Sequence, residues 1–141
     1  MKVGFSKGEA SGRLLLAGIA TRDLEAIREA EAINQAEGFV TNGSEGQRRL
    51  AAAGLAAIEG RPDDAVREAR AAVALFEAAG WTFVVAEAKL FMLLALPERH
   101  EFADWAAEAR ACFERLGVRP YLRWLDDLDA SRLPESVGAA S

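Results

Sequence analysis

The side chains of this chain that could carry chemistry are few, and their spacing matches no common catalytic or metal-binding pattern. The 141 residues include one histidine, His100, and one cysteine, Cys112. A zinc site built from them would need carboxylates for most of its ligands, although zinc sites normally rely on Cys and His. The sequence also lacks the phosphate-binding loop, the dinucleotide-binding glycine pattern, the paired-histidine zinc motif and the nucleophile elbow. We therefore predict no catalytic, cofactor-binding or metal-binding residues, and a protein that is not an enzyme.

The other polar candidates have simple structural interpretations. His100 precedes a predicted helix, where an exposed helix-start residue is favoured over a pH-sensitive contact. Asp126, Asp127 and Asp129 could hold a cation loosely, but on an amphipathic helix they are typical of a solvated face. The segment Asn42-Gly43-Ser44 matches a glycosylation sequon, which we interpret as a turn. None of these groups predicts a reaction.

Any site must be positioned by helices that repeat along the chain. Residues 64–81 return in similar order at residues 101–118. Four identities lie 37 positions apart: Ala69 and Ala106, Phe76 and Phe113, Glu77 and Glu114, and Gly80 and Gly117. A period of this length, with helical spacing inside it, is typical of stacked helix pairs. Cys112 occupies the position of Leu75 in the preceding copy, so we expect a packed core thiol.

Glycine and proline mark the ends of these helices. Gly80 and Gly117 are expected to end helices in the left-handed conformation, so that Trp81 and Val118 pack back on the last turn. Pro62 is expected at the first position of a helix, where its missing N–H costs nothing. The punctuation therefore predicts helix boundaries as well as helices.

The predicted helices cover residues 9–19, 22–37, 46–59, 62–79, 82–96 and 100–116, and a seventh follows Pro120. Thr21 is the expected cap of the second helix, and Gly38 its expected terminator. His100 and Glu101 are expected to open the sixth helix. Residues 40–46 are rich in small and polar side chains and are expected to form a mobile loop.

Composition favours an all-α protein and excludes several partners. Hydrophobic residues make up 51% of the chain and charged residues 28%, which excludes intrinsic disorder. Alanine, the best helix former, is the most abundant residue. The formal net charge of −5 argues against direct contact with nucleic acid, which requires clustered Lys and Arg. No apolar run is long enough to span a bilayer, so we predict a cytoplasmic protein with no membrane partner.

These patterns predict an all-α fold, a right-handed solenoid of about three antiparallel helix pairs followed by a C-terminal capping helix. One such domain is expected over residues 1–130, with a flexible tail over residues 131–141. Residues 82–96 are apolar around almost the whole helix circumference, so this helix is expected to lie inside and to be covered on several sides. Trp105 shares a helix face with Cys112 and is expected to be buried with it.

The pattern resembles the tetratricopeptide-repeat superfamily. The second helix of that repeat carries small residues at fixed positions after a glycine turn, a layout that Gly60-Arg-Pro-Asp-Asp-Ala65 and Ala72 follow. Ala53 matches the small residue of the preceding helix. Residues 107–122 also resemble the closing repeats of the C-terminal helical arrays in large bacterial ATPase-type signalling proteins, including LuxR-type regulators and class III adenylate cyclases. The resemblance implies a role in bacterial signalling or transcriptional regulation. It brings over no catalytic or DNA-binding residue, because those modules have no counterpart here.

The first functional hypothesis is a non-catalytic scaffold that binds a peptide or partner domain on the concave face of the array. The first helix of each pair lines that face, and its polar residues are Arg13, Gln47, Arg48, Arg49, Glu87 and Lys89. Of these, we expect Arg48, Arg49 and Lys89 to bind the partner, together with Phe91 and Met92. No cofactor is expected.

Two alternatives stay open. The chain could form a homo-oligomer through the ends of the array, using Leu14, Leu15 and Ile19 or Tyr121 and Trp124. It could also be a small-molecule sensor or an enzyme with a pocket around Phe83, Phe91 and Trp105.

Overall fold

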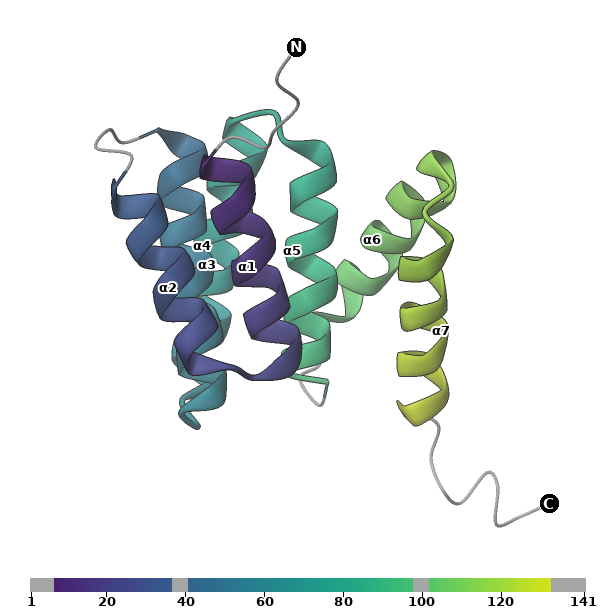
Figure 1. The fold of residues 1–141 in the computed structure, drawn as a ribbon. Coiled ribbons are helices and arrows are strands. Elements are labelled where there is room, and N and C mark those ends of the chain that lie inside the picture. Colours follow the sequence, from purple (N-terminus) through teal and green to yellow (C-terminus); the bar gives the residue numbers. More distant parts are fainter. Residues whose placement is uncertain (1–6, 37–40, 98–101, 133–141) are drawn as a thin grey trace, which may run out of the picture.

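A computed structural model describes residues 7–36, 41–97 and 102–132, and all secondary structure in these ranges is helical (Figure 1). The helices are α1 (Lys7–Thr21), α2 (Leu24–Ala36), α3 (Asn42–Ile58), α4 (Pro62–Ala78), α5 (Thr82–Ala95), α6 (Ala103–Leu116) and α7 (Arg119–Arg132). The predicted all-α class is confirmed. None of these helices has both the length and the hydropathy needed to cross a bilayer. Most of the tail predicted over residues 131–141 lies outside the described ranges.

The glycine terminators expected after α4 and α6 are present. Gly80 and Gly117 adopt φ angles of +77° and +71°. The next residue donates its N–H back across each glycine, from Trp81 to the Phe76 carbonyl at 3.1 Å and from Val118 to the Phe113 carbonyl at 2.9 Å. Gly60 ends α3 in the same way, with a φ of +77°. Gly38 and the segment His100-Glu101 lie outside the described residues.

The mobile loop predicted over residues 40–46 is wrong for the residues from Asn42 onward, which form the first turn of α3. The helix is started by a capping box. The Thr41 hydroxyl accepts from the Ser44 N–H at 3.0 Å, and the Ser44 hydroxyl accepts from the Thr41 N–H at 2.8 Å. The sequon Asn42-Gly43-Ser44 is therefore helical and is not an isolated turn. The small polar residues of this segment are typical of loops, but here they begin a helix that is stabilised by tertiary packing.

The predicted cap of α2, Thr21, is also wrong, because the observed cap lies two residues later in the chain. Thr21 is the last residue of α1, and its hydroxyl donates to the Ala17 carbonyl at 2.8 Å. The Asp23 carboxylate caps α2 instead, accepting from the Ala26 N–H at 3.2 Å. The chain turns between the two helices at Arg22, whose φ of +56° is unusual for a residue with a side chain.

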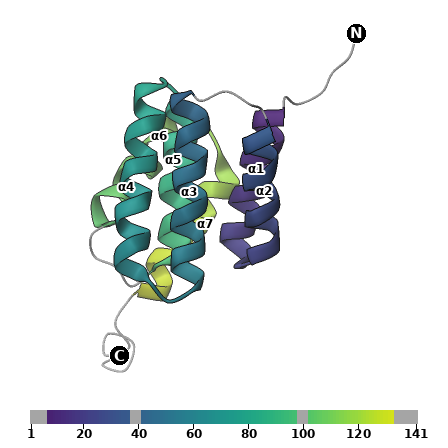
Figure 2. The same cartoon turned by 90° about the vertical axis from the view of Figure 1, so that its left-hand side faces the viewer.

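The helices form two adjacent hairpins, α1–α2 and α3–α4, with α5 packed beside both (Figures 1 and 2). Helix α5 contacts α1, α3, α4, α6 and α7, and residues 86–93 are all buried. The prediction of an inner helix covered on several sides is confirmed. Helices α6 and α7 continue the chain beyond α5, on the side away from α2 (Figure 1).

Helices α1, α3 and α5 each contact the other two. In a regular helix-pair array each pair contacts only its neighbours, so the first helices of the first and third pairs would not meet. Here α1 lies directly against α5.

The predicted burial of the α6 side chains is confirmed. Cys112 and Trp105 are each 6% exposed. The Trp105 ring stacks on Phe102 with centroids 4.4 Å apart, and the Arg70 guanidinium lies 5.6 Å from its centre. Cys112 is thus a packing residue of the α6 core face.

Candidate binding site

The five residues predicted to bind a partner do not form one accessible surface. Arg48 is exposed and pairs with Glu45 on its own helix, and Arg49 pairs with Glu68 of α4 at 3.1 Å. Lys89 is 7% exposed and pairs with Glu108 of α6. Phe91 is 5% exposed and Met92 is fully buried, so both belong to the core. Partner binding by Arg48 and Arg49 stays a prediction.

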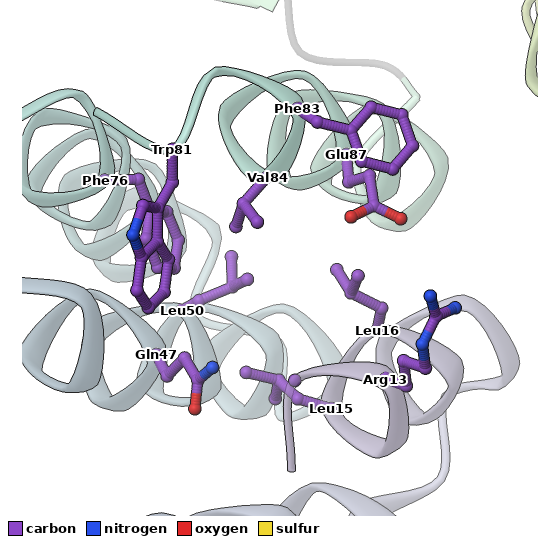
Figure 3. Close-up of a pocket in the computed structure, with 11 residues that line it drawn as sticks. Arg13, Leu15, Leu16, Gln47, Leu50, Phe76, Trp81, Phe83, Val84 and Glu87 are labelled. Atoms are coloured by element: carbon purple, nitrogen blue, oxygen red, sulfur yellow. The ribbon is translucent and has the colours of Figure 1, made fainter. Parts of the chain in front are cut away.

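Between α1, α3 and α5 lies a cavity of about 480 Å³ that is partly open to solvent, with a volume in the range usual for ligand pockets (Figure 3). Its lining comes from the three first helices and from the α4–α5 junction. The residues are Gly12, Arg13, Leu15 and Leu16 of α1, Gln47 and Leu50 of α3, Phe76 of α4, Trp81, and Phe83, Val84 and Glu87 of α5. The site therefore depends on the contact between α1 and α5.

One wall of the cavity is an aromatic pair held against α3 by two glycines. Trp81 follows the terminator of α4 and stacks on Phe76, with ring centroids 6.0 Å apart and planes 16° apart. A Cβ on Gly46 would lie 2.7 Å from the Phe76 ring, and one on Gly43 would lie 2.2 Å from the Trp81 ring. Only glycine lets the rings lie this close to the helix. A pair of glycines three residues apart is the sequence signal that the loop interpretation missed.

The polar end of the cavity contains Glu87 and Arg13. Glu87 is 8% exposed, and its carboxylate accepts a hydrogen bond from the Tyr121 hydroxyl at 2.8 Å. Figure 3 shows the Glu87 carboxylate and the Arg13 guanidinium directed into the same space, from α5 and α1. Arg13 is exposed, whereas Glu87 is part of the wall. The fixed charge of the cavity is therefore the carboxylate.

Burial raises the pKa of Glu87 above its ordinary value, and the Tyr121 hydrogen bond and the Arg13 charge oppose this shift without cancelling it. Burial, and then the bond to Glu87, raises the pKa of Tyr121 to about 12. Tyr121 therefore remains a proton donor at any physiological pH. The charge on Glu87 is only partly compensated by its neighbours.

The opposite end of the cavity contains an amide and an indole. Gln47 is 8% exposed and Trp81 is 41% exposed. In Figure 3 both lie across the cavity from Glu87 and Arg13, with Leu50 and Val84 between the two ends. The cavity is thus apolar in the middle and polar at each end. Such a surface can hold an apolar group and orient it by hydrogen bonds and charge.

The helices that form the site were predicted correctly, but the side chains predicted to bind a partner are not the ones that line the cavity. Arg13, Gln47 and Glu87 were among the polar residues of the first helices, and they are the ones at the cavity. Of the predicted pocket residues Phe83, Phe91 and Trp105, only Phe83 lines it.

The two end faces considered for self-association differ in their solvent exposure. Leu15 and Ile19 are 2% and 1% exposed because α1 packs on its own chain. On α7, Trp124 is 40% exposed and contacts Phe91, with ring centroids 5.9 Å apart.

Comparison with known proteins adds no family to this description. No protein-family model matches the chain. No curated protein and no solved structure shows detectable similarity to it. The function must therefore be argued from the cavity and the residues that line it.

Proposed function

We propose that this chain is a non-catalytic binding domain that receives an apolar segment of a partner protein or peptide between α1, α3 and α5. The observation that carries the proposal is the cavity itself, which lies on the helices expected to form the binding face of a helix-pair array. Its half-exposed Trp81 is a suitable anchor, because aromatic residues dominate the energetics of many protein interfaces.

We further propose that the helices form a right-handed, tetratricopeptide-like array of three pairs with α7 as the capping helix. The support is that first helices of successive pairs pack on each other, α1 on α3, α3 on α5, and α5 on α7; the additional contact of α1 with α5 makes this array more closed than a regular one. The glycine terminators of α3, α4 and α6 add to this support. As the resemblance implies, we place its action in the bacterial cytoplasm, in signalling or transcriptional regulation.

A small-molecule sensor is the second candidate. One observation favours it, namely that the volume of the cavity falls within the range typical of small-molecule sites. The peptide hypothesis is preferred because the cavity is polar at two separated ends. A peptide is long enough to contact both ends at once, with its backbone near Gln47 and a side chain near Glu87.

The test is selection of random 12-residue peptides displayed on phage, followed by binding measurements with two matched variants. Leu16→Arg places a long cation in the cavity at a partly exposed position, from which its head can reach water. Leu116→Arg makes the same change at a residue that is 54% exposed and lies outside the cavity. We expect selected peptides to shift the NMR signals of the Gln47 side-chain amide and the Trp81 indole. Leu16→Arg should weaken their binding at least about tenfold, and Leu116→Arg should not.

The proposal fails if no selected peptide shifts these signals, or if Leu16→Arg binds as the wild type does. If only compounds of a small-molecule fragment collection produce the shifts, the sensor hypothesis replaces it.

A further inference from the structure

We propose that the bound segment places a lysine or arginine side chain against Glu87, beside the apolar side chain that fills the middle of the cavity. This inference rests on the proposed function and adds the chemistry of the partner.

Glu87 differs from the other buried charge of α5. Lys89 is equally buried, but it forms an ion pair with Glu108. Among the described residues, none forms an ion pair with Glu87 within 4 Å; its hydrogen bond comes from the neutral Tyr121 hydroxyl. An ionised carboxylate has about four acceptor positions, so one bond leaves acceptor capacity on the cavity side. Buried charges in proteins are normally paired, and this one is open to a ligand.

The groups around Glu87 define what it can accept. Tyr121 faces it from α7 and Arg13 faces it from α1. The Arg13 charge lowers the pKa of Glu87, but burial, the largest cause, raises it, so a further cation beside the buried carboxylate would favour its charged form. An anionic ligand would meet this buried charge and could gain from Arg13, where solvent exposure weakens the attraction. A cation would be stabilised directly by the buried carboxylate.

Two further features agree with a basic partner. The net charge of −5 attracts basic segments over a longer range. Leu16, Leu50 and Val84 adjoin the polar end, so a basic side chain at Glu87 would have an apolar neighbour in the cavity (Figure 3). The recognised sequence is therefore one apolar residue close to one Lys or Arg.

The test uses three capped peptides, acetyl-Leu-Ala-Lys-Leu-amide and its versions with norleucine or glutamate in place of lysine. Norleucine keeps the apolar stem of lysine without the charge. Binding is followed at millimolar peptide concentrations by the NMR signals of the Gln47 amide and the Trp81 indole. We expect the lysine peptide to bind at least about tenfold more tightly than the norleucine peptide, as for a charge paired in a desolvated site.

Glu87→Gln should abolish this preference, so that the lysine and norleucine peptides bind the variant equally. The variant should also melt about 3 °C above the wild type, because it removes a desolvated charge and keeps an oxygen for Tyr121. Loss of lysine preference could then not be attributed to unfolding. Glu114→Gln makes the same charge change at an exposed residue of α6 and should preserve the preference.

The outcomes separate this inference from the proposed function. Equal binding of the lysine and norleucine peptides, weakened by Leu16→Arg, overturns the inference and supports the binding domain. Preference for the glutamate peptide overturns the inference in favour of anion recognition by Arg13. If none of the three peptides moves either signal while phage-selected peptides do, this inference alone is overturned.

Discussion

At the residue scale, the position of the cavity wall is determined by side chains that are missing. Gly43 and Gly46 occupy one face of the first turns of α3, and both are buried. The rings of Trp81 and Phe76 fill the space that a methyl group would take. Glycine lowers the stability of a helix by about 1 kcal/mol relative to alanine, so its use here is explained by packing.

Gly46→Ala is therefore expected to destabilise the protein. Its Cβ would lie 2.7 and 2.8 Å from two ring carbons of Phe76, a fully buried side chain that is stacked on Trp81. Overpacking of this kind costs about 1–3 kcal/mol, which exceeds the gain in helix propensity. Urea denaturation followed by circular dichroism measures the change in the free energy of unfolding.

Gly43→Ala is the comparison. Its added Cβ would lie even closer to a ring, 2.2 Å from Trp81, but that side chain is 41% exposed and can shift outward. We expect a smaller loss than for Gly46→Ala, at or below the lower end of the range of about 1–3 kcal/mol that overpacking costs. A larger loss for Gly43→Ala than for Gly46→Ala would contradict this account of the wall.

At the element scale, α7 is attached to α5 by aromatic contacts and one buried hydrogen bond. The Tyr121 ring lies 6.2 Å from Phe83 and 6.0 Å from Phe91, centroid to centroid. Its hydroxyl donates to Glu87 at 2.8 Å. The Glu87 carboxylate thus lines the cavity and also binds the capping helix α7.

Tyr121→Phe keeps the ring contacts and removes only this bond. Glu87 would be left with its charge buried and without its donor, so we expect a loss of about 1–2 kcal/mol at neutral pH. Amide hydrogen exchange should show the loss as faster exchange in α7. Unchanged protection of α7 would mean that the bond contributes nothing to its attachment.

The pH dependence of the Tyr121→Phe loss follows from the sign of the Glu87 shift. Because burial raises the pKa of Glu87 in the folded protein, the cost of its charge is fully present above that pKa. The cost disappears as the pH falls below the ordinary value of 4.5, where Glu87 is neutral in both folded and unfolded states. Denaturation curves for both proteins at neutral and acidic pH should therefore converge in acid.

The elements also show what could be predicted from the sequence and what could not. Helix ends marked by Pro62, Gly80 and Gly117 were predicted within a residue, because these residues act through their own backbone conformation. The start of α3 was missed, because its glycines are explained by rings that arrive from a later part of the chain.

The orientation of α5 had no sequence signal either. Glu87 and Lys89 lie about 200° apart around a helix, and α5 is apolar on nearly every side. Periodicity therefore gave no direction for either charge. Packing turned Lys89 toward Glu108 of α6 and left Glu87 facing α1 and Tyr121. The helices of the site were predictable, whereas the side chains that line it depended on this rotation.

At the scale of the whole molecule, the C-terminal ends of the three first helices, α1, α3 and α5, meet at Arg22. Its guanidinium donates to the carbonyls of Ala57, near the end of α3, and Ala95, the last residue of α5, each at 3.4 Å. Arg22 itself follows the last residue of α1. A cation is favoured among helix C-termini because their carbonyls carry partial negative charge. One residue therefore joins the helices that enclose the cavity.

Replacing Arg22 tests whether this junction holds α1 against α5. Arg22→Ala loses both hydrogen bonds and keeps a Cβ at a φ of +56°, so we expect destabilisation of about 1–2 kcal/mol. Arg22→Gly also loses the bonds but removes the backbone strain, which is worth about 1 kcal/mol. The glycine variant should therefore melt above the alanine variant. In both, hydrogen exchange should accelerate in α1 and α2 more than in α3 and α4, because the first hairpin loses its attachment at this end. Equal exchange across both hairpins would mean that α1 is held to α5 by the apolar contacts alone, and the cavity would then owe its shape to Leu15 and Leu16.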